Sequence, residues 1–362
     1  MRDGPGTSVI SAWGSSDLDG PIANILVYRP RYIGDVLLTI PILRQLRESF
    51  PAARITFLAS PSVREIVDHC PYVDETLIFD RDGRHKGLAG RWRLVAELRR
   101  RKFDLALVLM RSLSSAMISY LAGARYRAGF GTELRGPLLT HSVAYSQTTH
   151  EASCFLHVLE SLGIECPPPR LEVWIPPQAH CYAENWFRAK SILPTKPVLF
   201  VNPGGQADAR CLHPARLAFL ADRASEEYGY QVIVIWGPGE QAAARQVIGA
   251  MRSGAELAPP TSLLQLAALF ARGTTLLTHD SGPLHLAAAV GISTVGVFGP
   301  TNPAKWNPPG DRNLYVQTVT RCTSCKLQKC RYGRPCINQV DDEAVFRAFD
   351  RLWERQRLRC AA

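Results

Sequence analysis

The chain has 362 residues, of which 46% are apolar, enough to fill the cores of two domains of ordinary size. Lys and Arg outnumber Asp and Glu by 42 to 32, and the resulting net charge of +10 favours anionic partners. No stretch approaches the roughly eighteen consecutive apolar residues of a membrane span, and the first residues lack the apolar run of a signal peptide. We therefore expect a soluble protein with a disordered tail over residues 1–21.

From residue 22 onward, short apolar strands alternate with stretches of helical spacing. Strands are expected at 23–28, 54–59, 75–80 and 103–110. Such alternation is typical of a parallel sheet covered by helices. It predicts an N-terminal Rossmann-like domain over residues 22–165.

Five prolines interrupt this rhythm within residues 163–177, which predicts a hinge over residues 166–177. The alternation then restarts, with strands at 198–204, 231–239, 274–280 and 293–300 and helices at 214–228, 240–252, 262–271 and 283–290. We expect an α/β protein whose two doubly wound domains face a cleft, the second over residues 178–340. A C-terminal helix over residues 341–362 could pack back on the N-terminal domain.

The loop after the first strand, residues 29–35, reads RPRYIGD. Gly34 allows a sharp turn, and Asp35 lies where a helix begins. Arg29 and Arg31 make the loop attractive to an anionic ligand, so we expect them to bind an acceptor. Asp35 has two open interpretations: a helix cap, or a base that takes a proton from an acceptor hydroxyl.

A second loop, residues 202–214, reads NPGGQADARCLHP. Gly204 and Gly205 expose backbone amides without side chains in the way, and Arg210 follows. The loop is neither a Walker loop nor a dinucleotide fingerprint. It suits a diphosphate held by amides and one cation, with an ordinary glycine turn as the alternative.

A third loop opens the stretch HDSGPLHLAAAVGISTVGVFGPT at residues 279–301. Ser281, Gly282 and Pro283 start a helix whose first amides have no intrahelical partner, which favours an anion. Asp280 and His285 flank these amides. His285 is placed to donate to a phosphate oxygen; otherwise it is a core histidine and Asp280 a cap.

Residues 81–102 carry nine Lys and Arg against Asp82 and Glu97. This basic segment suits an anionic membrane surface or a phosphorylated glycan, or it is only a solvated helix face. We expect no nucleic-acid partner, because the sequence has no zinc finger, aromatic-rich strand motif or recognition helix.

Ten cysteines without an export signal indicate mostly reduced thiols and a cytoplasmic protein. Four of them, Cys322, Cys325, Cys330 and Cys336, follow the spacing C-x2-C-x4-C-x5-C. Four thiolates could hold zinc, but the long loop between ligand pairs is missing. Reduced thiols or a local disulfide are the alternatives, and we expect no metal ligand among the residues of the functional site.

Three motifs together carry a family resemblance: IGDVLLTIPILRQLRESFP, NPGG with the following Arg210, and HDSGPLHLAAAVGISTVGVFGPTNP. They resemble glycosyltransferase family 9, the bacterial lipopolysaccharide heptosyltransferases, over nearly everything from Ile22 to the last helix. The resemblance implies a GT-B fold and an inverting transfer of heptose from ADP-L-glycero-D-manno-heptose to a lipopolysaccharide core acceptor. It implies no cofactor and no required metal.

The resemblance also implies roles for single residues. Asp35 would be the general base, across the cleft from the phosphate and sugar site, where His285 would act. Glu240 would bind the ribose of ADP. The donor would further contact Gly34, Gly204, Gly205, Arg210, Asp280, Ser281 and Gly282. Arg210 and Leu212 replace the usual lysine and tryptophan, so a transferase of the same fold with another nucleotide sugar is an alternative.

Two further interpretations are weaker. A metal-dependent transferase could use the acidic residues of DRD at 80–82, although Gly83 and the basic residues after it look like a surface loop. A non-catalytic homologue could bind glycan alone. The expected location is cytoplasmic, with the option of peripheral contact with the inner membrane.

Overall fold

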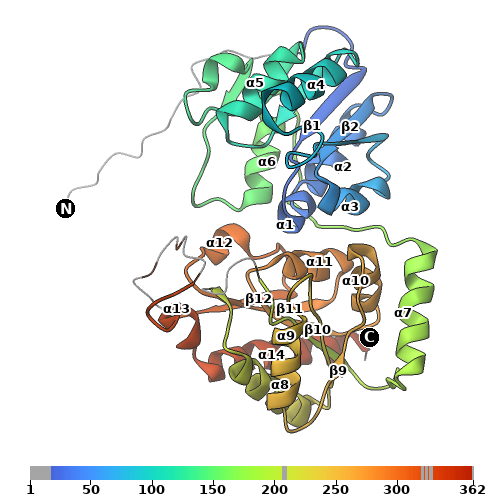
Figure 1. Cartoon of the computed structure of the whole chain (residues 1–362), viewed down its shortest axis with the longest axis vertical. Helices are drawn as coiled ribbons and strands as arrows, with labels where there is room; N and C mark the ends of the chain where they lie inside the picture. Colours follow the sequence, from blue (N-terminus) through green and yellow to red (C-terminus); the bar gives the residue numbers. More distant parts are fainter. Residues whose placement is uncertain (1–17, 206–209, 319–321, 323–324, 326–328, 361–362) are drawn as a thin grey trace, which may run out of the picture.

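The computed structural model describes residues 18–205, 210–318, 322, 325 and 329–360. In this part the chain forms two six-stranded sheets in which every pair of neighbouring strands is parallel. Figure 1 shows each sheet with its own helices, one group above the other along the long axis. We call β1 to α6 the first half and α7 to α14 the second half. The expected tail lies mostly outside the described residues.

The first half alternates strand and helix, as the sequence predicts. Its strands are β1 (Asn24–Tyr28), β2 (Arg54–Ala59), β3 (Glu75–Ile78), β4 (Leu105–Val108), β5 (Tyr126–Phe130) and β6 (His141–Val143). Its helices are α1 (Ile33–Leu37), α2 (Ile40–Ser49), α3 (Arg64–Asp68), α4 (Gly87–Arg99), α5 (Leu113–Leu121) and α6 (Glu151–Glu160), with the 3-10 turns η1 (Pro61–Val63) and η2 (Gly136–Leu138).

The second half repeats this pattern. Its strands are β7 (Val198–Val201), β8 (Gln231–Val234), β9 (Glu256–Leu257), β10 (Thr275–His279), β11 (Ser293–Phe298) and β12 (Asn313–Gln317). Its helices are α7 (Pro177–Ala189), α8 (Pro214–Tyr228), α9 (Gln241–Ala250), α10 (Leu263–Phe270), α11 (Gly282–Val290), α12 (Pro303–Trp306), α13 (Pro335–Asn338) and α14 (Asp342–Cys360).

Both sheets have the same strand order. The first runs β3-β2-β1-β4-β5-β6, and the second, read from its other edge, runs β9-β8-β7-β10-β11-β12. Each is a Rossmann-like sheet whose strand order reverses in the middle, between β1 and β4 or between β7 and β10. The predicted fold class, two doubly wound α/β sheets, is therefore confirmed.

Strand residues alternate between two packed faces. In β1, Ile25 and Val27 belong to one buried cluster, and Leu26 and Tyr28 belong to another on the opposite face. Because both faces are covered, these strands read as continuous apolar runs in the sequence. The same pattern made them easy to predict.

Some elements differ from the prediction. The stretch after β1 forms two helices, α1 and α2, because Pro41 cannot donate a hydrogen bond to a preceding carbonyl and instead starts α2. Strands β5 and β6 were not predicted, since YRAGF and HSV carry polar residues and HSV is also short. Residues 164–176, around the expected hinge, have no helix or strand.

The C-terminal helix α14 packs on the second half. Val345, Phe346, Phe349 and Leu352 join one buried cluster with Leu217 of α8 and Val297 of β11. Packing on the N-terminal domain is therefore wrong, because the apolar stripe of α14 is already covered by α8, β11 and β12. In the described part of the chain, no helix has the length and apolar content needed to cross a bilayer.

Candidate active site

The three loops singled out in the sequence follow strands at the two switch points. Residues 29–35 follow β1, residues 202–205 follow β7, and residues 280–281 follow β10. Carboxyl ends of parallel strands at a switch point are where such sheets bind ligands. Figure 1 shows α1 and α11 facing each other where the two halves meet.

Asp35 lies in the first turn of α1 and is largely buried. Its Oδ2 forms an ion pair with Nη2 of Arg29 at 2.9 Å. Burial raises the pKa of Asp35, Arg29 opposes that rise, and the charge of Glu151 adds to it. The carboxylate is therefore held by one cation in a poorly hydrated place, where it is a stronger base than an exposed aspartate.

Arg29 is occupied inside the first half. Only 6% of it is exposed, and its Nη1 donates to the carbonyl of Leu109 at 3.2 Å. The expectation that Arg29 binds the acceptor does not fit, because its guanidinium already holds Asp35. Arg31 is exposed and lies over the ring of Tyr32, so it stays available to a ligand.

Gly34 marks a close approach between the halves. A Cβ atom at Gly34 would lie 2.6 Å from Cδ2 of His285, and one at Gly282 would lie 3.0 Å from Cβ of Ile33. The amino ends of α1 and α11 thus meet with glycine on each side. Sequence reasoning assigned Gly34 to a turn, whereas its lack of a side chain serves this contact.

His285 lies in the first turn of α11 and is buried against Gly34. Burial lowers the pKa of His285 to about 3, and the nearby His150 contributes to that shift. The imidazole is consequently neutral at physiological pH and can donate one hydrogen bond. No hydrogen bond to its Nδ1 is found within the described residues.

The amino end of α11 is not capped by its own serine. Ser281 makes no side-chain cap; its Oγ instead lies 3.1 Å from Oγ1 of Thr278 and accepts from Nδ2 of Asn202 at 3.2 Å. The first amides of a helix carry partial positive charge, so this end favours an anion. Asp280 is half-buried, and the loss of solvent raises its pKa; Thr301 and Arg210 oppose that rise, and Asp35 adds to it.

The glycine loop after β7 is tied to α11 and α9. Asn202 donates to Oγ1 of Thr278 at 2.9 Å and to the carbonyl of Gly204 at 3.1 Å, so it joins this loop to β10. Glu240 accepts from the amide of Gly237 at 2.9 Å and occupies the space where Gly204 would carry a side chain. Gly205 lies against Cys211, and residues 206–209 lie outside the described part.

A buried charged cluster that the sequence analysis missed lies beside Asp35. Oε1 of Glu151 lies 3.7 Å from Nη2 of Arg29, and its Oε2 lies 3.0 Å from Nζ of Lys305. Glu151 begins α6 of the first half, whereas Lys305 comes from α12 of the second half. No sequence motif predicts this ion pair, because its two residues are 154 positions apart in the chain.

The arrangement brings most predicted residues to one junction. Asp35, Gly34, Asp280, Gly282 and His285 meet there, and Arg210 lies close enough to Asp280 to affect its pKa. Chemically, the junction offers a base from the first half, and an amide-rich helix end with a cation from the second. This combination can deprotonate a hydroxyl while stabilising an anionic leaving group.

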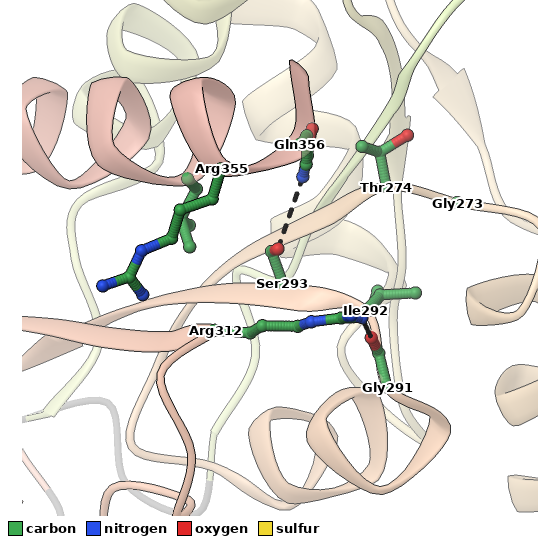
Figure 2. Close-up of a pocket in the computed structure, with 9 residues that line it drawn as sticks. Gly273, Thr274, Gly291, Ile292, Ser293, Arg312, Arg355 and Gln356 are labelled. Atoms are coloured by element: carbon green, nitrogen blue, oxygen red, sulfur yellow. Dashed lines mark hydrogen bonds between the residues drawn. The ribbon is translucent and has the colours of Figure 1, made fainter. Parts of the chain in front are cut away.

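A hollow of about 260 Å³ lies elsewhere, at the amino ends of β10 and β11. Figure 2 shows Gln356 donating to Ser293 at 3.3 Å and Arg312 donating to the carbonyl of Gly291 at 3.0 Å. Ligands of parallel sheets bind at the opposite edge, so this hollow is not the candidate site.

The cysteine segment lies partly outside the described residues. Cys336 is buried, and burial raises its pKa with a further rise from the thiols of Cys322, Cys330 and Cys325. Of the residues that the structure describes, no three His, Cys, Asp or Glu gather to hold a metal ion. Asp80 of the DRD motif accepts from the amides of Gly83 and Arg84, which closes a surface turn.

Comparisons with known proteins place the chain in a family. Residues 91–335 match the model of glycosyltransferase family 9 (heptosyltransferase). Lipopolysaccharide heptosyltransferase 2 of Escherichia coli K12 is 26% identical over 311 residues, which cover 82% of this chain and 88% of that protein.

Two solved structures have the same fold. A family 9 glycosyl transferase from Veillonella parvula superposes with a TM-score of 0.83 at 24% identity, covering 94% of this chain and 98% of that one. The E. coli ADP-heptose lipopolysaccharide heptosyltransferase II gives 0.73 at 22% identity, covering 92% and 99%. Both alignments span the two sheets, which agrees with the GT-B type expected from the sequence.

Proposed function

Because the chain belongs to glycosyltransferase family 9, we propose that this glycosyltransferase moves heptose from ADP-L-glycero-D-manno-heptose to the inner core of lipopolysaccharide. The observation that carries the proposal is the meeting of Asp35 with the amino end of α11 at the junction of the halves. The sugar and acceptor are inferred from two relatives: one is a lipopolysaccharide heptosyltransferase, and a solved one is an ADP-heptose lipopolysaccharide heptosyltransferase.

On this proposal the second half binds the donor. The diphosphate lies at the amides of Gly282, Gly204 and Gly205, and Arg210 supplies the cation. Glu240, beside the glycine loop, accepts from the ribose hydroxyls. Since charge on the leaving ADP is neutralised by protein groups, the reaction needs no metal, and we expect full transfer activity in excess EDTA.

The first half supplies the base. The acceptor oxygen gives its proton to Asp35 and forms a bond to the anomeric carbon, while the bond from that carbon to the diphosphate breaks and ADP leaves with its electron pair. Because base and leaving group lie on opposite sides of the sugar, the configuration inverts. The neutral His285 donates one hydrogen bond to the sugar or phosphate.

Acceptor binding is assigned to exposed arginines of the first half. A small hollow of about 20 Å³, lined in part by Tyr28, Phe79, Arg81 and Arg91, lies at the carboxyl ends of β1, β3 and β4. With Arg31 these groups suit the anionic sugars or phosphates of a core oligosaccharide. They replace Arg29, which holds the base.

The decisive test is Asp35→Asn. Transfer of heptose should fall by roughly a thousandfold or more, because a positioned general base accelerates proton transfer by about that factor. ADP binding, measured by calorimetry, should stay close to wild type. Near-normal transfer would contradict Asp35 as the base. If the wild type binds ADP but transfers no sugar to any core acceptor, the protein is a glycan-binding homologue. If it transfers only from another nucleotide sugar, the proposed donor is wrong.

We also propose peripheral contact with an anionic membrane from the cytoplasmic side, through an apolar face of α4 and α5. Leu88 and Trp92 of α4 are 76% and 60% exposed, and Leu113 and Met117 of α5 are exposed too. The two helices pack together over the same face of the first sheet, so their outer sides form one surface. Leu134, 95% exposed, extends from the neighbouring loop.

The charge around this face suits anionic lipid. Exposed Arg93, Arg99 and Arg100 make no ion pair to any described residue. Apolar side chains, tryptophan among them, enter the interface of a bilayer while arginines attract its phosphates. A lipid-linked acceptor would then be met at the bilayer surface.

Vesicle sedimentation tests this contact. Wild type should bind phosphatidylcholine vesicles containing phosphatidylglycerol and lose most binding to pure phosphatidylcholine. Leu88→Ser with Trp92→Ser should weaken binding about tenfold or more, whereas Leu193→Ser with Phe219→Ser, exposed apolar residues of the second half, should not. Equal binding by the two double variants would contradict the α4–α5 face.

A further inference from the structure

Lys305 is a buried residue of one half whose side chain contacts the other half. It belongs to α12 of the second half, yet its Nζ donates to the carbonyls of Ser146 and Thr149 of the first half at 2.8 and 3.1 Å. It also lies over the ring of Tyr145, 4.3 Å from the centroid, and only 4% of it is exposed. Lys305 therefore has no room for substrate phosphate, and its charge serves another purpose.

The main ionic partner of Lys305 is Glu151, which is fully buried. Oε2 of Glu151 accepts from Lys305 at 3.0 Å and from the hydroxyl of Tyr145 at 2.6 Å. Its other oxygen, Oε1, has no hydrogen bond among the described residues and faces Arg29 at 3.7 Å. Arg29 itself lies closer to Asp35, at 2.9 Å. Two carboxylates thus face one arginine, and Lys305 satisfies only one of them.

We propose that Lys305 is a positioning residue for the base: by holding Glu151, it leaves Arg29 on Asp35 and makes the base depend on contact between the two halves. A buried carboxylate without a cation is costly. If Lys305 is removed, or moves away with the second half, Glu151 draws Arg29 toward itself. Asp35 then loses its cation and becomes harder to ionise. The inference rests on the proposed role of Asp35.

Other charged groups around Asp35 do not replace this link. Arg111 and Glu151 of the first half affect the pKa of Asp35, Arg111 lowering it and Glu151 raising it, both after the larger effects of burial and Arg29. From the second half, Asp280 repels the charge of Asp35, and the neutral His285 lies against Gly34. Only Arg29 makes a direct ion pair with Asp35 in the described part of the chain.

The experiment is the pH dependence of kcat in Lys305→Met. Activity needs ionised Asp35, so it is lost as pH falls through the pKa of that group. With Arg29 drawn away, the acidic limb should move upward by about one pH unit, with KM for the donor little changed. Lys305→Met with Glu151→Gln should bring the limb back, because a neutral glutamine does not compete for Arg29. Lys305→Arg should keep the wild-type limb.

Controls separate this role from a structural one. Lys190→Met removes an exposed ion pair with Glu256 in the second half and should leave the limb in place. A structural role for Lys305 would lower activity equally at all pH values, and the double variant would be worse than the single one; that result would overturn the inference. If Lys305→Met does not fold, Glu151→Gln alone serves as the test. This variant must not move the acidic limb of the pH profile upward, because it removes the carboxylate that competes for Arg29.

A second readout does not depend on transfer. The carboxyl signal of Asp35, assigned in carbon-labelled protein by its loss in Asp35→Asn, should titrate at higher pH in Lys305→Met than in wild type. If wild type transfers no heptose, the proposed function fails while this titration still decides the inference. If wild type transfers heptose and neither the limb nor the titration moves, the inference alone is wrong.

Discussion

Single residues at the junction are fixed by what surrounds them as much as by their own chemistry. Arg29 and Arg31 are two positions apart in one loop, yet Arg29 is buried on Asp35 and Arg31 is exposed. Gly34 and Gly282 each occupy a place where a side chain would meet the other half. The junction therefore tolerates little added volume.

Gly34→Ala tests this point. Its new methyl group would lie 2.6 Å from Cδ2 of His285, so α1 and α11 must separate. We expect a loss of about 1–3 kcal/mol in the free energy of unfolding, together with reduced transfer activity. Urea unfolding and a transfer assay measure the two effects.

Gly249→Ala is the matched control. Gly249 lies in α9, has open space where a Cβ would be, and has no positive φ. Alanine there should stabilise the protein by about 0.4–1 kcal/mol and leave transfer unchanged. Similar losses in both variants would show that Gly34 is not at a close contact.

At the scale of elements, β10 and α11 form the unit to which we assign the donor. β10 ends at His279 and α11 carries His285, and both imidazoles are buried. Burial lowers the pKa of His279 to about 4 and that of His285 to about 3. Both rings are therefore neutral in the folded protein near neutral pH.

The unit should therefore be sensitive to acid. Unfolded histidine titrates near pH 6.5, so the unfolded state binds protons first and stability falls as pH drops below about 6.5. At pH 5 each histidine should cost roughly 2 kcal/mol of unfolding free energy relative to pH 7. Urea unfolding at both pH values measures the loss. His285→Gln should lose about half of the histidine-dependent difference; an unchanged difference would mean that His285 is not held neutral.

At the scale of the whole molecule, the two halves share a core. One buried cluster includes Val27 of β1, Val36 of α1, Leu286 of α11 and Phe200 of β7. The buried Lys305–Glu151 pair and the bond from the amide of Leu263 to Glu65 also join the halves. This continuity favours cooperative behaviour over two independent domains.

We therefore expect one thermal unfolding transition, which ADP shifts as a whole. At a hundred times its dissociation constant, ADP should add about 2.7 kcal/mol to stability, because it binds only the folded chain. Calorimetry with and without ADP measures this. Two transitions, of which ADP moves only one, would mean that the halves unfold separately and that the shared cluster does not couple them.

The sequence by itself determined the two sheets and the three site loops. Strands such as Val198–Val201 are apolar on both faces, and the glycines and prolines after them mark turns, so both features are local. Asp35, Gly204, Asp280 and His285 could be found in this way. Strands β5 and β6 carry polar residues, and β6 has only three residues, so they gave too little periodicity to be predicted.

The tertiary structure decided how those residues are used. That Arg29 is buried on Asp35 depends on the packing around both, and the contacts of Gly34 with His285 and of Lys305 with Glu151 join positions far apart in the chain. Local patterns carry no information on which buried carboxylate a distant cation will reach. The same reason explains α14: its apolar stripe was evident from the sequence, but only the packed sheets show that it covers the second half.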